Sequence, residues 1–164
     1  MRMSPHEIAE IVAIAVPPPV VWAAVSNPAD YGRWSPEATG ATRRSPAPSS
    51  PWAVGDRFTG HNRARFSWRT QCRVVAAQTD RRFAFDVNVG PFPIARWSFE
   101  LAPLPDGGTR VTQRWTDRRD GILGTLVKPA GIPVGRGYDA ATRNRITMRA
   151  TLDALKADLE RSTP

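Results

Sequence analysis

The sequence is poor in the residues that carry redox and metal chemistry. It has one cysteine, Cys72, and two histidines, His6 and His61, among 164 residues. A single cysteine excludes an internal disulfide and suits the reducing cytosol, so we expect a cytoplasmic protein. These few side chains form no spaced set of zinc ligands, and we expect no metal and no cofactor.

Catalytic sequence motifs are also missing. The chain contains no G-x-S-x-G, no glycine-rich phosphate loop and no histidine placed to activate a hydroxyl. These absences argue against classical hydrolysis and phosphoryl transfer. An enzyme with this sequence would act mainly by shaping and orienting a reactive substrate, with one or two polar groups moving protons.

Lysines and long apolar runs are scarce. Lys128 and Lys156 are the only lysines, so the net charge of +8 comes almost entirely from arginine. The arginines are scattered along strand-like segments, which argues against nucleic acid as a partner.

No apolar run is long enough to span a membrane, and the apolar stretch 8–16 lacks the basic flank and cleavage pattern of a secretory signal.

Short strand-like segments make up most of the chain. Residues 7–16 are rich in β-branched side chains and stop at three prolines, which predicts a strand followed by a helix start. Short helical segments are expected at 20–25 and 29–33, and the proline-rich 45–51 is expected to be a loop. From residue 56 onward the pattern predicts an antiparallel meander, with strands at 57–63, 67–77, 82–89, 95–102 and 109–117.

The last segment, 138–161, predicts a long helix. Apolar residues recur there at every third or fourth position, so the expected buried face is Tyr138, Ala141, Arg145, Met148, Leu152, Leu155 and Leu159. The sequence has no internal repeat and no second domain pattern. Residues 1–164 are therefore interpreted as a single domain.

Aromatic side chains share the inward face of the predicted sheet. Period-two alternation separates apolar from polar residues in each strand. Aromatic residues of several strands then face one interior, which predicts a container for an apolar ligand. The apolar candidates for the cavity wall are Trp34, Phe58, Trp68, Phe85, Trp97, Trp115 and Met148.

A few polar residues share the inward face. They are Asn62, Thr70, Gln113, Asp117 and Arg145. Sparse polar groups in an apolar pocket are typical of a small-molecule site, but a structural role stays open for each, including an Asp117–Arg145 ion pair. Cys72 also faces inward, where a thiol usually acts as a small apolar residue, whereas His61 falls on the outward face and is not a candidate base.

Several segments are similar to those of a known superfamily. Residues 20–36, with Val-Trp ahead of Asn27-Pro28 and the run Tyr31-Gly-Arg-Trp-Ser-Pro36, resemble its opening helical segment. Residues 55–62 with Trp68 and Cys72 resemble its sheet strands. Residues 107–117 and 148–156 resemble its closing hairpin and helix.

Over nearly its whole length the chain resembles the SRPBCC (START and birch-pollen-allergen-like) superfamily, in its actinobacterial polyketide cyclase/dehydrase-like branch. The resemblance implies an α+β helix-grip fold, in which a curved antiparallel sheet wraps around a long C-terminal helix and two short helices follow the first strand. A hydrophobic cavity is expected between sheet and helix, with 45–51 and 121–137 at its mouth. Members bind lipids, polyketides, hormones or quinones, and some cyclise or dehydrate polyketide chains.

Three functions follow as hypotheses. The first is binding or carriage of a hydrophobic small molecule, such as a lipid, polyketide or quinone, in the cavity. The second is a polyketide aromatase/cyclase or dehydratase, in which Asn62, Gln113, Asp117 and Arg145 would orient carbonyls and move protons. The third is attachment to a partner through the basic exterior. The expected partner is the small molecule, with a weak homodimer as a further option.

Overall fold

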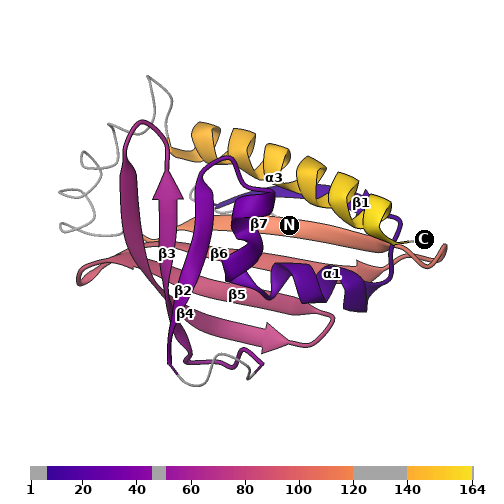
Figure 1. Cartoon of the computed structure of the whole chain (residues 1–164), viewed down its shortest axis with the longest axis horizontal. Helices are drawn as coiled ribbons and strands as arrows, with labels where there is room; N and C mark the ends of the chain where they lie inside the picture. The colour runs from indigo at the N-terminus through magenta and orange to yellow at the C-terminus, as the bar shows by residue number, and fades with distance from the viewer. Residues whose placement is uncertain (1–6, 46–50, 120–139, 164) are drawn as a thin grey trace.

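Seven strands and three helical segments form the described part of the chain, residues 7–45, 51–119 and 140–163 of a computed structural model (Figure 1). Their order is β1 (Glu7–Ile14), α1 (Pro18–Val25), η1 (Pro28–Arg33), β2 (Ala38–Ser45), β3 (Arg57–Arg63), β4 (Ser67–Gln78), β5 (Arg82–Val89), β6 (Phe92–Pro103), β7 (Thr109–Asp117) and α3 (Ala140–Ser162). The expected helix-grip class is confirmed: short helices follow the first strand and a long helix closes the chain.

The strands form one antiparallel sheet in the order β1-β7-β6-β5-β4-β3-β2. Register shifts interrupt the pairing within β2, within β4 and between β5 and β6. Such bulges bend and twist strands. Figure 1 shows the result, since β2 and β3 run across the direction of β5 to β7 while α3 lies over the concave side.

The strand β2 is missing from the sequence-based prediction. It lies at the edge of the sheet, and its residues show no clear apolar alternation. Gly40 has φ of +138°, and the register shifts twice along this strand. An irregular edge strand carries a weak period-two signal. The loop expected at 45–51 overlaps β2 at Ser45, and 46–50 lie outside the described residues.

The two halves of α3 have different neighbours. Its C-terminal half carries Leu152 and Leu155, which pack in a core with Ile14 and Val21. Its N-terminal half carries Met148, which packs with Trp115 of β7 and Ile8 of β1. The predicted helix is thus confirmed, and Met148, Leu152 and Leu155 of its expected buried face are buried. Arg145 is exposed instead, and Tyr138 lies outside the described residues.

Polar side chains of α3 bind the free edge of β1. Lys156 Nζ donates to the carbonyl of Ala13 at 2.7 Å, and Arg149 donates to the carbonyl of Ile11 at 3.3 Å. The N–H of Ala15 donates to Glu160 Oε1 at 2.8 Å. An open sheet edge presents unpaired backbone groups, and these contacts satisfy part of that edge. They also fix the helix along β1.

Arginines on the outer face of the sheet pair with carboxylates of neighbouring strands. Asp86 accepts a hydrogen bond from Arg96 Nε at 2.6 Å and a second from Arg118. Burial alone would raise the pKa of Asp86, but the two guanidinium groups outweigh it and hold this pKa below its usual value of 3.8. Much of the positive charge is therefore used within the fold.

Replacement of Asp86 by Asn should lower the free energy of unfolding at pH 7 by about 1 kcal/mol, because two guanidinium groups lose their charged partner. The pKa of Asp86 is lower in the folded than in the unfolded protein. Its contribution is therefore complete above the unfolded pKa and is lost as the pH falls through the folded pKa. Urea unfolding of both proteins between pH 7 and pH 2 measures the difference, which should disappear at the acidic end.

The matched control is Asp153→Asn, since that carboxylate is 61% exposed and its arginine partner is 3.9 Å away. This variant should match the parent at every pH. A difference for Asp86→Asn that did not change with pH would contradict the ion-pair explanation.

Candidate functional site

An internal cavity of about 210 Å³ lies between the inner face of the sheet, η1 and α3. The volume exceeds the roughly 150 Å³ of an apolar cavity that holds benzene and is below the roughly 300–1,000 Å³ of sites for drug-sized molecules. The cavity therefore suits a small organic molecule or one part of a longer one. Eight aromatic side chains line it: Tyr31, Trp34, Phe58, Trp68, Phe85, Trp97, Phe99 and Trp115.

Contacts among the rings hold part of this wall in place. Phe58 and Phe85 meet edge to face with ring centroids 5.2 Å apart. Tyr31 of η1 lies 5.9 Å from Phe99 and 6.2 Å from Phe85, and its hydroxyl donates to the carbonyl of Val25 at 2.7 Å. Burial raises the pKa of Tyr31 well above its usual value, so the phenol stays protonated and continues to donate.

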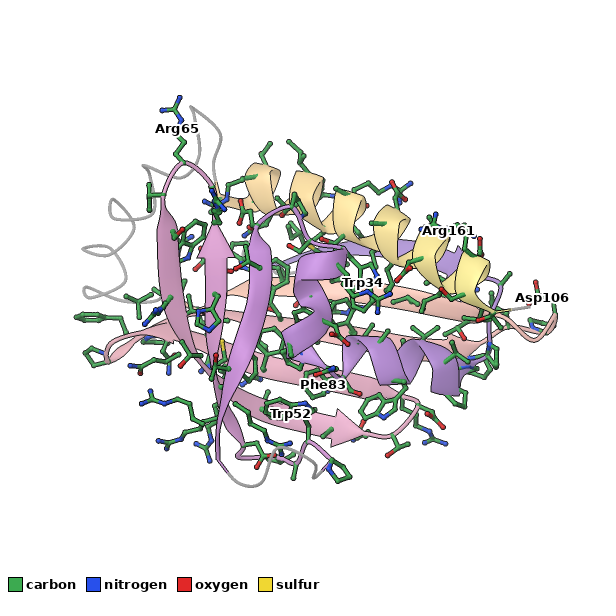
Figure 2. All side chains as sticks on the ribbon, viewed as in Figure 1. Trp34, Trp52, Arg65, Phe83, Asp106 and Arg161 are labelled. Carbon is green, nitrogen blue, oxygen red and sulfur yellow. The ribbon has the colours of Figure 1, made fainter. Side chains whose placement is uncertain are left out.

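Trp34 connects the short helices to α3. Its indole Nε1 donates to Asp158 Oδ2 at 2.8 Å, and Arg33 donates to the same oxygen at 2.8 Å. Figure 2 shows Trp34 between the short helices and α3. The ring thus lines the cavity while its polar edge is used to fix the helix.

Ten of the twelve predicted site residues lie in the cavity wall. They come from η1's C-terminal side, from β3 to β7 and from α3: Trp34, Phe58, Asn62, Trp68, Thr70, Phe85, Trp97, Gln113, Trp115 and Met148. Period-two alternation placed the strand residues on the correct face. That they bind a ligand stays a prediction.

The prediction that Arg145 faces the cavity is wrong. Its side chain is 55% exposed and donates to Glu10 of β1 at 3.2 Å. The buried stripe of α3 runs instead through Asn144, Met148 and Leu155. Arg145 lies at the border of this stripe, where a long charged side chain reaches solvent. In place of the ion pair considered between Asp117 and Arg145, Asp117 pairs with Arg119 and Arg145 pairs with Glu10.

Asp117 does not line the cavity either. Its carboxylate binds Arg119, with Oδ1 2.8 Å from Nε and Oδ2 2.7 Å from a terminal nitrogen. β7 ends at Asp117, so the course of the chain after the strand decides which way this side chain turns. Arg119 does lie in the wall, and the hydrogen bonds to Asp117 raise its pKa.

Sequence reasoning missed several polar residues of the wall. Arg119 follows β7, Arg143 and the buried Asn144 belong to the first turns of α3, and Glu37 precedes β2. Glu37 and Arg143 are 3.7 Å apart. A helical phase shifted by one residue would have selected Asn144 in place of Arg145, but no local signal indicated Glu37 or Arg119.

A short line of polar side chains crosses β3 and β4 inside the cavity. Asn62 Nδ2 lies 3.5 Å from Thr70 Oγ1, which lies 3.6 Å from Cys72 Sγ. Gly60 makes room for this line, because a Cβ atom there would be 2.7 Å from Thr70 Oγ1. Burial raises the pKa of the Cys72 thiol to about 11. The thiol is therefore protonated at neutral pH and is not an activated nucleophile.

Gln113 is the most deeply buried polar side chain in the wall after Asn144. Only 5% of it is exposed, and its Oε1 has no hydrogen-bond partner among the described residues. A buried amide oxygen without a partner costs about 1–3 kcal/mol of stability. Such a group calls for an explanation beyond the fold.

His61, which the alternation placed on the outward face, is also among the wall residues. Nε2 lies 2.8 Å from Oγ1 of Thr42 in an exposed part of the sheet.

Among the described residues, no three His, Cys, Asp or Glu side chains gather in a way that would hold a metal ion. In the same part of the chain, no helix has the length and apolar character that a membrane span needs.

A second hollow, of about 460 Å³, lies between α1, β2 and β4. Trp22, Trp52 and Arg43 are in its wall. The guanidinium of Arg43 lies 4.1 Å from the centre of the Trp52 ring and 2.5 Å from Asp56 Oδ2. Its charge is thus already compensated, and the wall contains few other polar groups.

A curved sheet that grips a long helix around an aromatic cavity defines a helix-grip domain of the ligand-binding kind. The chain belongs to the family described as polyketide cyclase/dehydrase and lipid transport, whose model matches residues 5–160. The resemblance noted from the sequence, to the SRPBCC superfamily, is therefore confirmed. No curated protein matches the chain.

Solved structures share this fold at low sequence identity. The di-domain ARO/CYC StfQ of the steffimycin biosynthetic pathway is 16% identical, with a TM-score of 0.65 over 94% of this chain and 45% of that one. A polyketide-cyclase-like protein of Corynebacterium glutamicum is 23% identical, with a TM-score of 0.55 over 94% and 89%. A protein of Thermobifida fusca is 21% identical, with a TM-score of 0.62 over 95% and 94%.

The raised pKa of Cys72 predicts a thiol that reacts slowly in the folded protein. At pH 8 the thiolate of a group with a pKa of about 11 is scarce. Alkylation by iodoacetamide should be about 100-fold slower than in denaturant, where the pKa returns to its ordinary range. Mass spectrometry of samples quenched over time measures both rates. Fast labelling of the native protein would show an activated thiol.

Proposed function

We propose that the protein binds a hydrophobic small molecule in the cavity and carries or sequesters it. The observation that carries this proposal is the aromatic wall around about 210 Å³ of unfilled space. Protein interiors that enclose no ligand are close-packed and contain few voids larger than a water molecule. The family description, which includes lipid transport, supports the same conclusion.

The chemistry of the wall favours binding over catalysis. The charged residues of the wall are engaged in ion pairs, Arg119 with Asp117 and Arg143 with Glu37. The thiol of Cys72 stays protonated. General acid–base catalysis needs a titrating group within reach of the reacting atoms, and nucleophilic catalysis needs an activated one. The described wall offers mainly apolar surface and neutral hydrogen-bonding groups, and its one imidazole, that of His61, lies with Nε2 2.8 Å from Thr42 Oγ1.

A cyclase or dehydratase acting on a polyketide-like substrate is the second candidate. The observation in its favour is the presence of neutral polar groups, Asn62, Thr70 and Gln113, inside an otherwise apolar cavity. These groups could orient carbonyls of a reactive chain. Arg145 and Asp117 no longer take part in this hypothesis, because neither lines the cavity. The family description and the fold shared with StfQ are compatible with it.

Native mass spectrometry of freshly purified protein, followed by extraction under denaturing conditions, tests the first candidate directly. A co-purifying apolar molecule released on unfolding would support carriage. Turnover separates the two candidates, because a carrier returns its ligand unchanged while an enzyme returns a product of different mass. Conversion of an added polyketide-like substrate would favour the second candidate.

Partial filling of the cavity should weaken binding without unfolding the protein. Ala95 of β6 is 2% exposed and lies in the wall, so Ala95→Leu places an isobutyl group in the ligand space. We expect the affinity for the fluorescent probe 1-aminoanthracene to fall by about 10-fold or more, since overfilled sites cost about 1–3 kcal/mol. Probe fluorescence measures affinity, and circular dichroism checks the fold.

Ala102→Leu is the matched control, because Ala102 lies on the same strand and is exposed. It should bind the probe like the parent. Equal loss in both variants, or no loss in Ala95→Leu, would show that the probe binds elsewhere and would count against the cavity as the site.

A further inference from the structure

The hairpin that joins β3 to β4 carries basic and aromatic side chains at its tip. Residues 57–78 contain five arginines and neither Asp nor Glu. Arg63, Arg65 and Phe66 stand at the turn of this hairpin. We propose that the tip docks the protein on the surface of a bilayer that contains anionic lipids. The inference rests on the proposed function, because the bilayer is the phase from which an apolar ligand would enter the cavity.

The tip is a direct continuation of the cavity wall. Asn62 of β3 and Trp68 of β4 lie opposite each other in the register, and both line the cavity. The next pair is Arg63 with Ser67, and residues 64–66 close the hairpin. Figure 2 shows Arg65 at the outer end of the hairpin, with its side chain directed away from the domain. A surface that binds the tip therefore comes close to the cavity.

Phe66 is an exposed aromatic residue at the turn. It is 46% exposed, and its ring centroid lies 5.7 Å from that of Trp68 in the cavity wall. Transfer of the exposed part of this ring from water into a bilayer is favourable. Aromatic rings suit the boundary between headgroups and acyl chains, while neighbouring arginines keep their charged ends among the headgroups. The tip has both kinds of side chain.

The arginines near the tip are not compensated by carboxylates of the fold. Arg63, Arg65 and Arg69 are exposed. Within the described part of the chain, none of these three takes part in an ion pair. The carboxylate of Asp56, just before β3, binds Arg43 at 2.5 Å instead. The positive charge of the tip is therefore available to an anionic partner.

The other half of the sheet differs in this respect. On the outer face of β5 to β7, Arg96 binds Asp86 at 2.6 Å and Arg114 binds Glu100 at 3.2 Å. Arginines there serve the fold through pairs across neighbouring strands. The absence of acidic residues from 57–78 leaves the β3–β4 hairpin without such pairs. The uncompensated charge is thus concentrated on one hairpin.

An anionic bilayer fits this tip better than an acidic protein or nucleic acid does. A stable protein interface buries roughly 800 Å² on each partner, which is more than the few residues of a turn provide. Stacking of nucleic-acid bases uses several aromatic residues along a basic groove, and the tip presents one ring. A bilayer needs only a shallow apolar contact, which arginines strengthen through the negative surface potential.

Co-sedimentation with phosphatidylcholine vesicles, with and without phosphatidylglycerol, tests the inference. The parent should bind only the vesicles with phosphatidylglycerol, and salt should weaken this binding. Arg63→Gln combined with Arg65→Gln should weaken it about 30-fold, at about 1 kcal/mol for each arginine near the surface. Phe66→Ser should weaken it about 5-fold, because the ring no longer enters the bilayer.

The matched controls change the opposite end of the same strands. Arg57 and Arg73 are exposed and directly opposite each other, and Val54 before β3 is 66% exposed. Arg57→Gln with Arg73→Gln removes the same charge as the tip variant, and Val54→Ser also removes exposed apolar surface. The 7 residues of β3 place these positions roughly 20 Å from the tip, beyond the screening length of about 10 Å. Both controls should bind the vesicles like the parent.

Several outcomes would overturn the inference. Equal losses in tip and control variants would show attraction by net charge alone. Equal binding to vesicles with and without phosphatidylglycerol would remove the role of the arginines. Binding of the parent to soluble polyglutamate, but not to vesicles, would assign the tip to an acidic protein instead.

Binding of 1-aminoanthracene in the absence of vesicles separates this inference from the proposed function. The tip variants should bind the probe like the parent, since Arg63, Arg65 and Phe66 lie outside the cavity wall. A parent that binds the probe but no vesicles would overturn the docking and leave the cavity as a binding site. A parent that docks through the tip but binds no probe would support the docking and count against the proposed function. Circular dichroism checks the fold of every variant.

Discussion

The attachment of α3 to β1 and to the core is the constraint on which the cavity depends. The C-terminal half of the helix is fixed by Leu152 and Leu155 in the core and by Lys156 and Glu160 along the edge of β1. The N-terminal half lies over the curved part of the sheet, and there the side chains leave space. One helix thus closes the core at one end and forms a wall of the cavity at the other.

The cavity stays open because its wall is held in place by contacts that lie outside the cavity. Sheet bulges curve the strands, and ring contacts join η1 to β5 and β6. Tyr31 and Trp34 turn their apolar faces inward and satisfy their polar atoms on backbone or on Asp158. The rings therefore have fixed positions without needing a ligand. This is pre-organisation, which reduces the entropy lost on binding.

Polarity within the cavity determines what kind of molecule it suits. Arginines on the outer face of the sheet bind carboxylates of the fold, and the charged pairs of the wall are Arg119 with Asp117 and Arg143 with Glu37. What remains for a ligand is aromatic surface and the neutral groups of Asn62, Thr70 and Gln113. The description of the family covers both polyketide cyclases and lipid transport. Such a wall is compatible with either task, because both begin with enclosing an apolar molecule.

The sequence by itself determined the fold class and the inward side of β3 to β7, because alternation along a strand is a local property that needs no knowledge of neighbours. It could not determine β2, whose edge position and bulges remove that alternation. Nor could it choose Asn144 over Arg145, since both border the apolar stripe of α3 and only the position of Glu10 on β1 decides between them. Asp117 turned to Arg119 because the strand ends there. Contacts between distant segments settle such cases, and only the tertiary structure contains them.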